Sequence, residues 1–318
     1  MSDQISLTLA AGGSELPALV AQLAHPAADV AFVASATFAG ANVGRSIVVE
    51  ADVGSRTPGC SCCQMRVDLV DGIARAVRRR RPPRRVVVAL DGHDDAITAI
   101  HTILSDPLLA RLVRIDAVLA TVDAVHWATR LATGGPIDTD VGLDRLAVAD
   151  RVLVARSRHV TPDALGAIGH VLRSLNQVGP IIAPAIAGYA LDELVDIHAW
   201  HGAPAIGQPP GEPSPFLGDD APVTVVCRTD RALNADRVDE WLDEIIAGHA
   251  ARLLRLQGAI AVPGQTERTC VHGVRSWAMS HSEAEHPAGR RSTTSTVVLI
   301  GRGLPVASLH ADFAAAHR

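Results

Sequence analysis

The sequence contains no lysine, because all 29 of its basic residues are arginines. Nucleotide-hydrolysing enzymes with a glycine-rich phosphate loop place a lysine ammonium group against the β- and γ-phosphates. That cationic clamp is therefore excluded within this chain. Aromatic residues are also scarce, at 3% of the sequence, and the formal net charge is −5. A negative net charge argues against a protein whose whole surface binds nucleic acid.

Membrane and export signals are also missing. No stretch holds eighteen uninterrupted apolar residues, and the start, "MSDQISLTLAAGG", lacks a basic segment followed by an apolar run. We therefore expect a cytoplasmic protein with no membrane partner. Only five cysteines are present and three of them are bunched within residues 60–63, which is too close together to cross-link distant elements. A disulfide scaffold is excluded on this pattern.

Short apolar runs rich in β-branched residues alternate with longer segments of helical apolar spacing. Such runs are typical of buried parallel strands, and the alternation predicts a layered α/β domain with right-handed crossovers. One of the intervening helices is expected to place Val67, Val70, Ile73, Ala74 and Val77 on its apolar face. The expected strands are residues 5–10, 30–35, 46–50, 85–90, 115–122, 151–155 and 181–185.

The composition changes between residues 203 and 222, "APAIGQPPGEPSPFLGDDAP", which is rich in proline, glycine and acid. We interpret this stretch as a linker between a first domain, 1–202, and a second, 223–318. The second part is predicted to be a small α+β domain with an antiparallel sheet. Its first helix is expected to begin after Asn234 as the N-cap, and a closing helix to follow Pro305.

Several segments in this order carry a family resemblance. They are "GCSCCQMRVDLVDGI" at 59–73, "LATVDAVHW" at 119–127 and "ADRVLVARSRHV" at 149–160, followed in the second domain by "VHGVRSW" and "VVLIGRGL". Together they resemble the CobW-like (CobW/HypB/UreG-type) family of P-loop GTPases, which act in metal homeostasis. The resemblance implies a mostly parallel P-loop NTPase sheet followed by a smaller α+β domain of the CobW C-terminal type.

The chain departs from the family pattern at the phosphates. Gly12, Gly13 and Ser14 follow the first expected strand and can form a turn and a helix start, but the lysine of GxxxxGK[ST] is absent. On the strand that the family ends with a glutamate, this chain has Ala89, with Asp91 two residues further on. Both changes weaken the binding of a metal–nucleotide complex, so we do not expect GTP and Mg²⁺ as cofactors.

The base-reading motif is altered as well. Where the family has "NKTD", this chain has Ala155, Arg156, Ser157 and Arg158. The family's aspartate accepts two hydrogen bonds from guanine, whereas arginine carries donors only. The resemblance and its departures together indicate a divergent subgroup with a degenerate nucleotide site, a pseudo-GTPase that is not a robust enzyme.

Cys60, Cys62 and Cys63 lie where a strand is expected to end and a helix to begin. A helix N-terminus lowers the pKa of a thiol and so favours the thiolate, which is the form that binds Zn²⁺. The alternatives are three small buried side chains or a redox pair, which adjacent cysteines form only with strain. Ligand chemistry favours zinc, and His93 is a candidate for the fourth ligand. Cys227 and Cys270 alternate on expected strands, which favours core packing for both.

A run of seven arginines, "RAVRRRRPPRR", occupies residues 75–85. Positive charge is favourable at the C-terminus of a helix, and a solvated charged surface is the simplest interpretation. The density of the run also suggests contact with RNA or an acidic protein, chiefly through Arg78, Arg79, Arg80 and Arg81. No aromatic residues interleave with them to stack on bases.

These observations lead to one main hypothesis and two alternatives. The main hypothesis is a zinc-binding CobW-like protein of zinc homeostasis, a carrier, sensor or adaptor for a client metalloprotein. The first alternative is a zinc-responsive adaptor for a ribosome-associated protein, because the chain is similar to CobW-like proteins that recruit a ribosome-hibernation factor. The second is a GTP-dependent metallochaperone with an unconventional nucleotide site.

Overall fold

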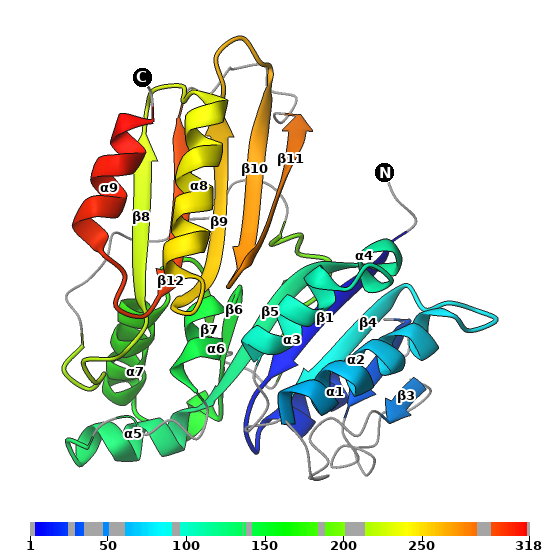
Figure 1. The fold of residues 1–318 in the computed structure, drawn as a ribbon. Coiled ribbons are helices and arrows are strands. Elements are labelled where there is room, and N and C mark those ends of the chain that lie inside the picture. The colour runs from blue at the N-terminus through cyan, green and yellow to red at the C-terminus, as the bar shows by residue number, and fades with distance from the viewer. Residues whose placement is uncertain are drawn as a thin grey trace.

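The structure is a computed structural model that describes residues 4–24, 29–34, 47–50, 61–90, 96–135, 137, 142–183, 188–200, 214–284 and 294–316. The chain forms two sheets, each with its own helices (Figure 1). None of the helices in these ranges combines the length and the apolar character that a bilayer crossing requires.

The first sheet is parallel throughout and has the strand order β3-β2-β4-β1-β5-β6-β7. This confirms the predicted class of fold. The observed strands match the expected ranges closely; the last one covers Ile181–Ile182, and residues 184–185 of its expected range lie outside the described residues. The strands are β1 (Ile5–Ala11), β2 (Val30–Ala34), β3 (Ile47–Glu50), β4 (Arg85–Leu90), β5 (Val113–Asp123), β6 (Arg151–Ala155) and β7 (Ile181–Ile182).

Helices cover both faces of this sheet. Successive strand residues point to opposite faces, so that Leu9 and Val88 pack with helices α2, α3 and α7, whereas Ala10 and Val87 pack with α1. The helices are α1 (Leu16–Leu23), α2 (Ser61–Val77), α3 (Ala96–Ser105), α4 (Leu109–Leu112), α5 (Ala124–Ala132), α6 (Leu143–Val148) and α7 (Pro162–Leu175), with short 3-10 turns η3 (Ser157–His159) and η4 (Leu191–Glu193).

The buried face of α2 differs from the expected one. Val67 was expected inside but is 63% exposed, whereas Leu69 is fully buried. Leu69, Ile73 and Ala76 are spaced by four and three residues, which places them on one side of a helix. The helix turns this stripe toward the sheet, with the larger Leu69 inside and Val67 outside. The expectation for Val67 was wrong.

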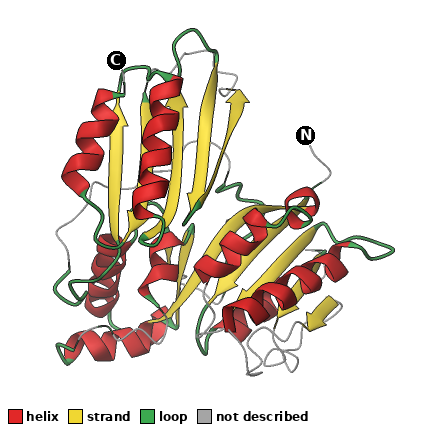
Figure 2. Cartoon of the chain, in the orientation of Figure 1, coloured by secondary structure: helices red, strands yellow, loops and turns green. Residues whose placement is uncertain are grey.

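The second sheet is antiparallel, in the order β11-β10-β9-β12-β8. Asn234 caps the first helix as predicted, accepting hydrogen bonds from the backbone N–H groups of Asp236 and Arg237. Cys227 and Cys270 are buried in the core, as their alternation indicated. Both helices lie on one face of the sheet (Figure 2). The elements are β8 (Val223–Thr229), α8 (Ala235–His249), β9 (Leu253–Ala261), β10 (Glu267–Val274), β11 (Trp277–Ala284), β12 (Ser295–Gly301) and α9 (Val306–Ala315).

A buried ion pair joins the two sheets. Arg255 on β9 bonds Asp150, just before β6, at 2.7 Å, and both side chains are only 3% exposed. The Asp150 carboxylate also accepts from the indole N–H of Trp200 and the backbone N–H of Val118, at 3.0 and 2.8 Å. The Arg255 guanidinium lies 4.5 Å from the centre of the Trp200 ring. Every charge in this cluster is therefore compensated, as a buried charge requires.

The predicted linker is only partly covered, since residues 201–213 lie outside the described ranges. Its second half is packed: Phe216 and Leu217 contact the main core, and the backbone N–H of Ile137 donates to the carbonyl of Phe216 at 3.2 Å. Arg302 bonds both Asp144 and Asp220, which ties this segment to the second sheet and the first. A boundary between domains at 203–222 remains a prediction.

We predict that Asp150→Asn destabilises the protein by about 3–5 kcal/mol, because it leaves the Arg255 charge buried without its counter-charge. The measurement is the shift in the guanidinium unfolding midpoint. The matched control is Arg237→Gln, which breaks an ion pair with Glu240 in which both side chains are mostly exposed. We expect the control to cost less than about 0.5 kcal/mol. Equal shifts for the two variants would contradict the role assigned to Asp150.

Candidate functional site

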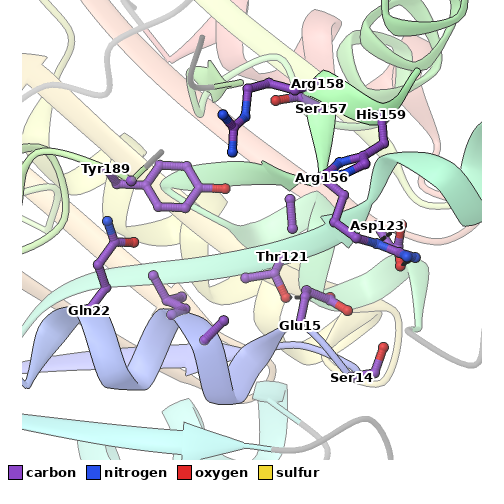
Figure 3. Close-up of a pocket in the computed structure, with 14 residues that line it drawn as sticks. Ser14, Glu15, Gln22, Thr121, Asp123, Arg156, Ser157, Arg158, His159 and Tyr189 are labelled. Atoms are coloured by element: carbon purple, nitrogen blue, oxygen red, sulfur yellow. Dashed lines mark hydrogen bonds and ion pairs between the residues drawn. The ribbon is translucent and has the colours of Figure 1, made fainter. Parts of the chain in front are cut away.

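The carboxyl ends of four parallel strands meet at one edge of the first sheet, where ligands bind in open α/β folds. Ala11 of β1 pairs with Leu90 of β4, and Asp123 of β5 pairs with Ala155 of β6. A cavity of about 490 Å³ lies beside these ends and is walled by α1, β5, the segment after β6 and residues 188–189 (Figure 3). This is where a P-loop fold binds its nucleotide.

The loop between β1 and α1 carries a carboxylate at the phosphate position. Glu15 is the N-cap residue of α1, and its Oε1 accepts from the backbone N–H of Gly13 at 3.1 Å and from the Thr121 hydroxyl at 2.6 Å. In a phosphate loop, backbone N–H groups and the positive end of the helix bind phosphate oxygens. Here a negatively charged side chain of the same chain takes one of those N–H groups.

Gly12, at the start of the same loop, allows close packing of β1 against β5. A Cβ atom built on Gly12 would lie 2.0 Å from the Thr121 hydroxyl oxygen, so only glycine allows β1 to end this close to β5. The helix then opens with Leu16 and Pro17. A phosphate loop opens its helix with lysine and serine or threonine, which contact phosphates and Mg²⁺. Leu16 is instead fully buried in the core.

The altered base-reading segment is engaged with the protein itself. Arg156 has a left-handed backbone conformation with φ of 55°, and its Nε bonds Asp123 at 3.0 Å. Asp123 also caps α5 by accepting from the backbone N–H groups of Val125 and His126. The Arg156 guanidinium is therefore committed to an ion pair at the end of β5.

Arg158 and Tyr189 line the opposite part of the cavity (Figure 3). Arg158 is exposed, and its guanidinium offers only donors, so this side chain cannot accept hydrogen bonds from guanine. The Tyr189 hydroxyl is buried and has no hydrogen-bond partner among the described residues. Burial, and secondly the charge of Glu15, raise the pKa of Tyr189 to about 12.

The structure brings together one group of the predicted site residues: Gly12, Gly13, Ser14, Arg156 and Arg158 all lie at this edge. Asp91, His93 and Cys60 fall outside the described residues. Cys62 and Cys63 lie in the first turn of α2, which begins at Ser61. Their side chains are not described.

The predicted metal-binding cysteines and the predicted partner-binding arginines lie at opposite ends of α2. Because α2 lies between parallel strands β3 and β4, its first turn, with Cys62 and Cys63, lies at the edge where the strands end. Its last turn and Arg78–Arg81 lie at the opposite edge. Within the described ranges, no group of three histidine, cysteine or acidic side chains is arranged to hold a metal ion.

Two family models match the chain. Residues 23–183 match the model described as the CobW/HypB/UreG nucleotide-binding domain, and residues 223–317 match the cobalamin synthesis protein cobW C-terminal domain. The chain belongs to the CobW/HypB/UreG family. The first match begins at residue 23, so it leaves out the β1–α1 loop in which this family member carries Glu15.

Similar proteins and structures agree with this placement. The zinc chaperone YjiA of Escherichia coli strain K12 is 23% identical over 270 residues, which are 81% of this chain and 80% of that protein. The Zn(II)-bound YjiA GTPase from E. coli has the same fold, with a TM-score of 0.73 and 19% identity over 99% of this chain and 100% of that one. A Zn(II)-bound triple mutant of YjiA gives a TM-score of 0.76, with the same identity and coverage.

Sequence reasoning missed three residues of the cavity, namely Glu15, Thr121 and Tyr189. Glu15 stands just after the glycine-rich turn, and a carboxylate at the start of a helix is favoured by the helix dipole, a signal that was available in the sequence. Tyr189 is the only tyrosine of the chain, which is a weaker signal. Thr121 gave none, because its role depends on the register between β1 and β5.

The single tyrosine permits a direct test of this geometry. We predict that alkaline titration of the phenolate absorbance gives a pKa of about 12 for Tyr189 in the folded protein. The same residue in denaturant should titrate near the ordinary value of about 10. Glu15→Gln removes one of the two causes and should lower the folded value. A folded pKa that equals the denatured one would show that Tyr189 does not lie in this cavity.

Proposed function

We propose that this protein is a zinc carrier or sensor of the CobW/HypB/UreG family that handles zinc without a conventional cycle of GTP binding and hydrolysis. The observation that carries the proposal is the position of Glu15. A carboxylate that takes the Gly13 N–H at the positive end of α1 competes with a phosphate for the same donors and repels its charge.

The rest of the nucleotide site supports this proposal. The side chain at the start of α1 is a buried leucine, and the chain offers no lysine to replace it. Arg156 is paired with Asp123, and Arg158 supplies donors where guanine needs an acceptor. Phosphoryl transfer depends almost entirely on such positioning and charge stabilisation, so these losses remove most of what a P-loop enzyme uses.

The cysteine segment supports zinc as the cargo. Cys60, Cys62 and Cys63 flank the start of α2, where the helix end favours thiolates, and three thiolates suit Zn²⁺ with one position left for a fourth ligand. The YjiA relative is named a zinc chaperone, and the YjiA GTPase has a Zn(II)-bound structure. An incomplete protein shell suits transfer of the ion to a client metalloprotein, since the open position can accept a client ligand.

A GTP-dependent metallochaperone remains the alternative that family membership favours, because its members include GTPases such as YjiA. It requires GTP to bind without lysine and beside Glu15. The other alternative, an adaptor for a ribosome-associated protein, relies on the exposed arginines that follow α2.

We expect the purified protein to bind one Zn²⁺ per chain in competition with a chromogenic zinc indicator near neutral pH. Replacing Cys60, Cys62 and Cys63 together by serine should abolish this uptake, because hydroxyl groups stay protonated at this pH and are poor ligands for zinc. Affinity should fall as the pH is lowered, since protons compete for the thiolates.

The matched control for this titration is Cys227→Ala. Burial raises the pKa of the Cys227 thiol to about 12, so this residue stays protonated and cannot supply a thiolate near neutral pH. The control should therefore keep full zinc uptake. Equal uptake by the triple serine variant and the wild type would refute the assignment of the site to the cysteine segment, whatever the outcome for nucleotides.

A further inference from the structure

The segment between α2 and β4 presents a dense group of positive charges. Arg78, Arg79, Arg80, Arg81 and Arg84 are all exposed, within seven consecutive residues. We call these five residues the arginine surface. It stands on a chain whose net charge is −5, so the positive charge is local and is not a property of the whole molecule.

The arginines on either side of the arginine surface form ion pairs within the protein. Arg75 pairs with Asp71 one turn earlier in α2, at 2.9 Å, and the Nε of Arg85 bonds Asp196 at 2.8 Å. Within the described part of the chain, no carboxylate is paired with any residue of the arginine surface. Structural arginines therefore flank the segment, and the five between them are open to a partner.

The segment is held in place at both ends. Val77 and Val86 are buried on either side of it, and Pro83 is buried between Arg81 and Arg84. The backbone N–H of Arg78 continues the helical bonding to Ala74, at 3.1 Å. Two consecutive prolines further restrict the backbone. A partner therefore meets charges on a short constrained loop, and little chain entropy is lost on binding.

The composition of the arginine surface indicates which kind of molecule it binds. Guanidinium groups bind phosphate oxygens in a bidentate manner, and five of them on one loop match the closely spaced charges of a nucleic-acid backbone. Proteins that bind single strands without sequence preference add aromatic side chains for base stacking, and this segment has none. We propose that the arginine surface binds the phosphate backbone of double-stranded nucleic acid, without reading its sequence.

This surface is independent of the proposed zinc function. The α2 helix has 17 residues, which corresponds to a length of about 25 Å between its cysteine end and its arginine end. Another exposed arginine, Arg111, lies on α4, which contacts α2. A duplex bound at the arginine surface leaves the cysteine end accessible to a client.

The test is fluorescence anisotropy with the full chain and a labelled RNA duplex of about 20 base pairs, titrated from about 50 to 200 mM salt. We expect binding that weakens steeply with salt. Changing Arg78, Arg79, Arg80 and Arg81 to glutamine should weaken binding at least tenfold at low salt. It should also reduce the slope of log K against log salt by about 3 to 4, because each phosphate that an arginine neutralises adds roughly 0.9 to that slope.

Two further variants distinguish an effect of positive charge on binding from an effect on folding. Changing the same four arginines to lysine keeps the charge and should retain most of the salt slope. The matched control changes four other exposed arginines to glutamine, Arg173, Arg228, Arg237 and Arg252, and should leave the affinity within about twofold. A DNA duplex of the same length should bind through the same residues, with any preference for RNA arising from the groove geometry.

Three outcomes would overturn the proposal. The first is no binding of either duplex at low salt. The second is equal loss of affinity in the control and the glutamine variant, which would show a general charge effect. The third is an acidic polypeptide that binds the arginine surface while neither duplex does, which would assign this surface to an acidic protein.

Discussion

The carboxylate of Glu15 at the start of α1 is the interaction on which the interpretation of this molecule depends. It satisfies the Gly13 N–H and the Thr121 hydroxyl at the edge of the sheet, and it does so with a negative charge beside the positive end of a helix. In a P-loop protein a phosphate supplies both the acceptor and the charge. This chain supplies them itself through Glu15, so the Gly13 N–H has an acceptor without a ligand.

The remaining differences fit this arrangement. Leu16, which is buried, follows Glu15 at the position where a phosphate loop has the lysine that contacts phosphates. In the base-reading segment, Arg156 is paired with Asp123. The fold is retained because its stability comes mainly from strands buried on both faces, and the ion pair of Asp150 with Arg255 lies outside the lining of the cavity. The proposed loss of nucleotide chemistry is therefore compatible with a full CobW-type architecture, since a fold does not fix its function.

Much of the fold could be predicted from the sequence, because buried parallel strands leave uninterrupted β-branched runs such as that of Arg85–Leu90. The capping of α8 by Asn234 was equally local. The face of α2 was mispredicted at Val67, because several apolar stripes compete on that helix and tertiary packing selects one. The losses at the nucleotide site remain predictions, and Glu15, Thr121 and Tyr189 were missed because their contacts join residues about a hundred positions apart or depend on burial.

If Glu15 occupies the phosphate position, GTP with Mg²⁺ cannot bind there, and equilibrium binding measures this. Equilibrium dialysis of the full chain against labelled GTP, at concentrations up to about 1 mM, covers the usual range of enzyme affinities for substrates. We expect no saturable binding of GTP to the wild-type protein at any of these concentrations. Saturable, Mg²⁺-dependent binding of one GTP per chain would contradict it.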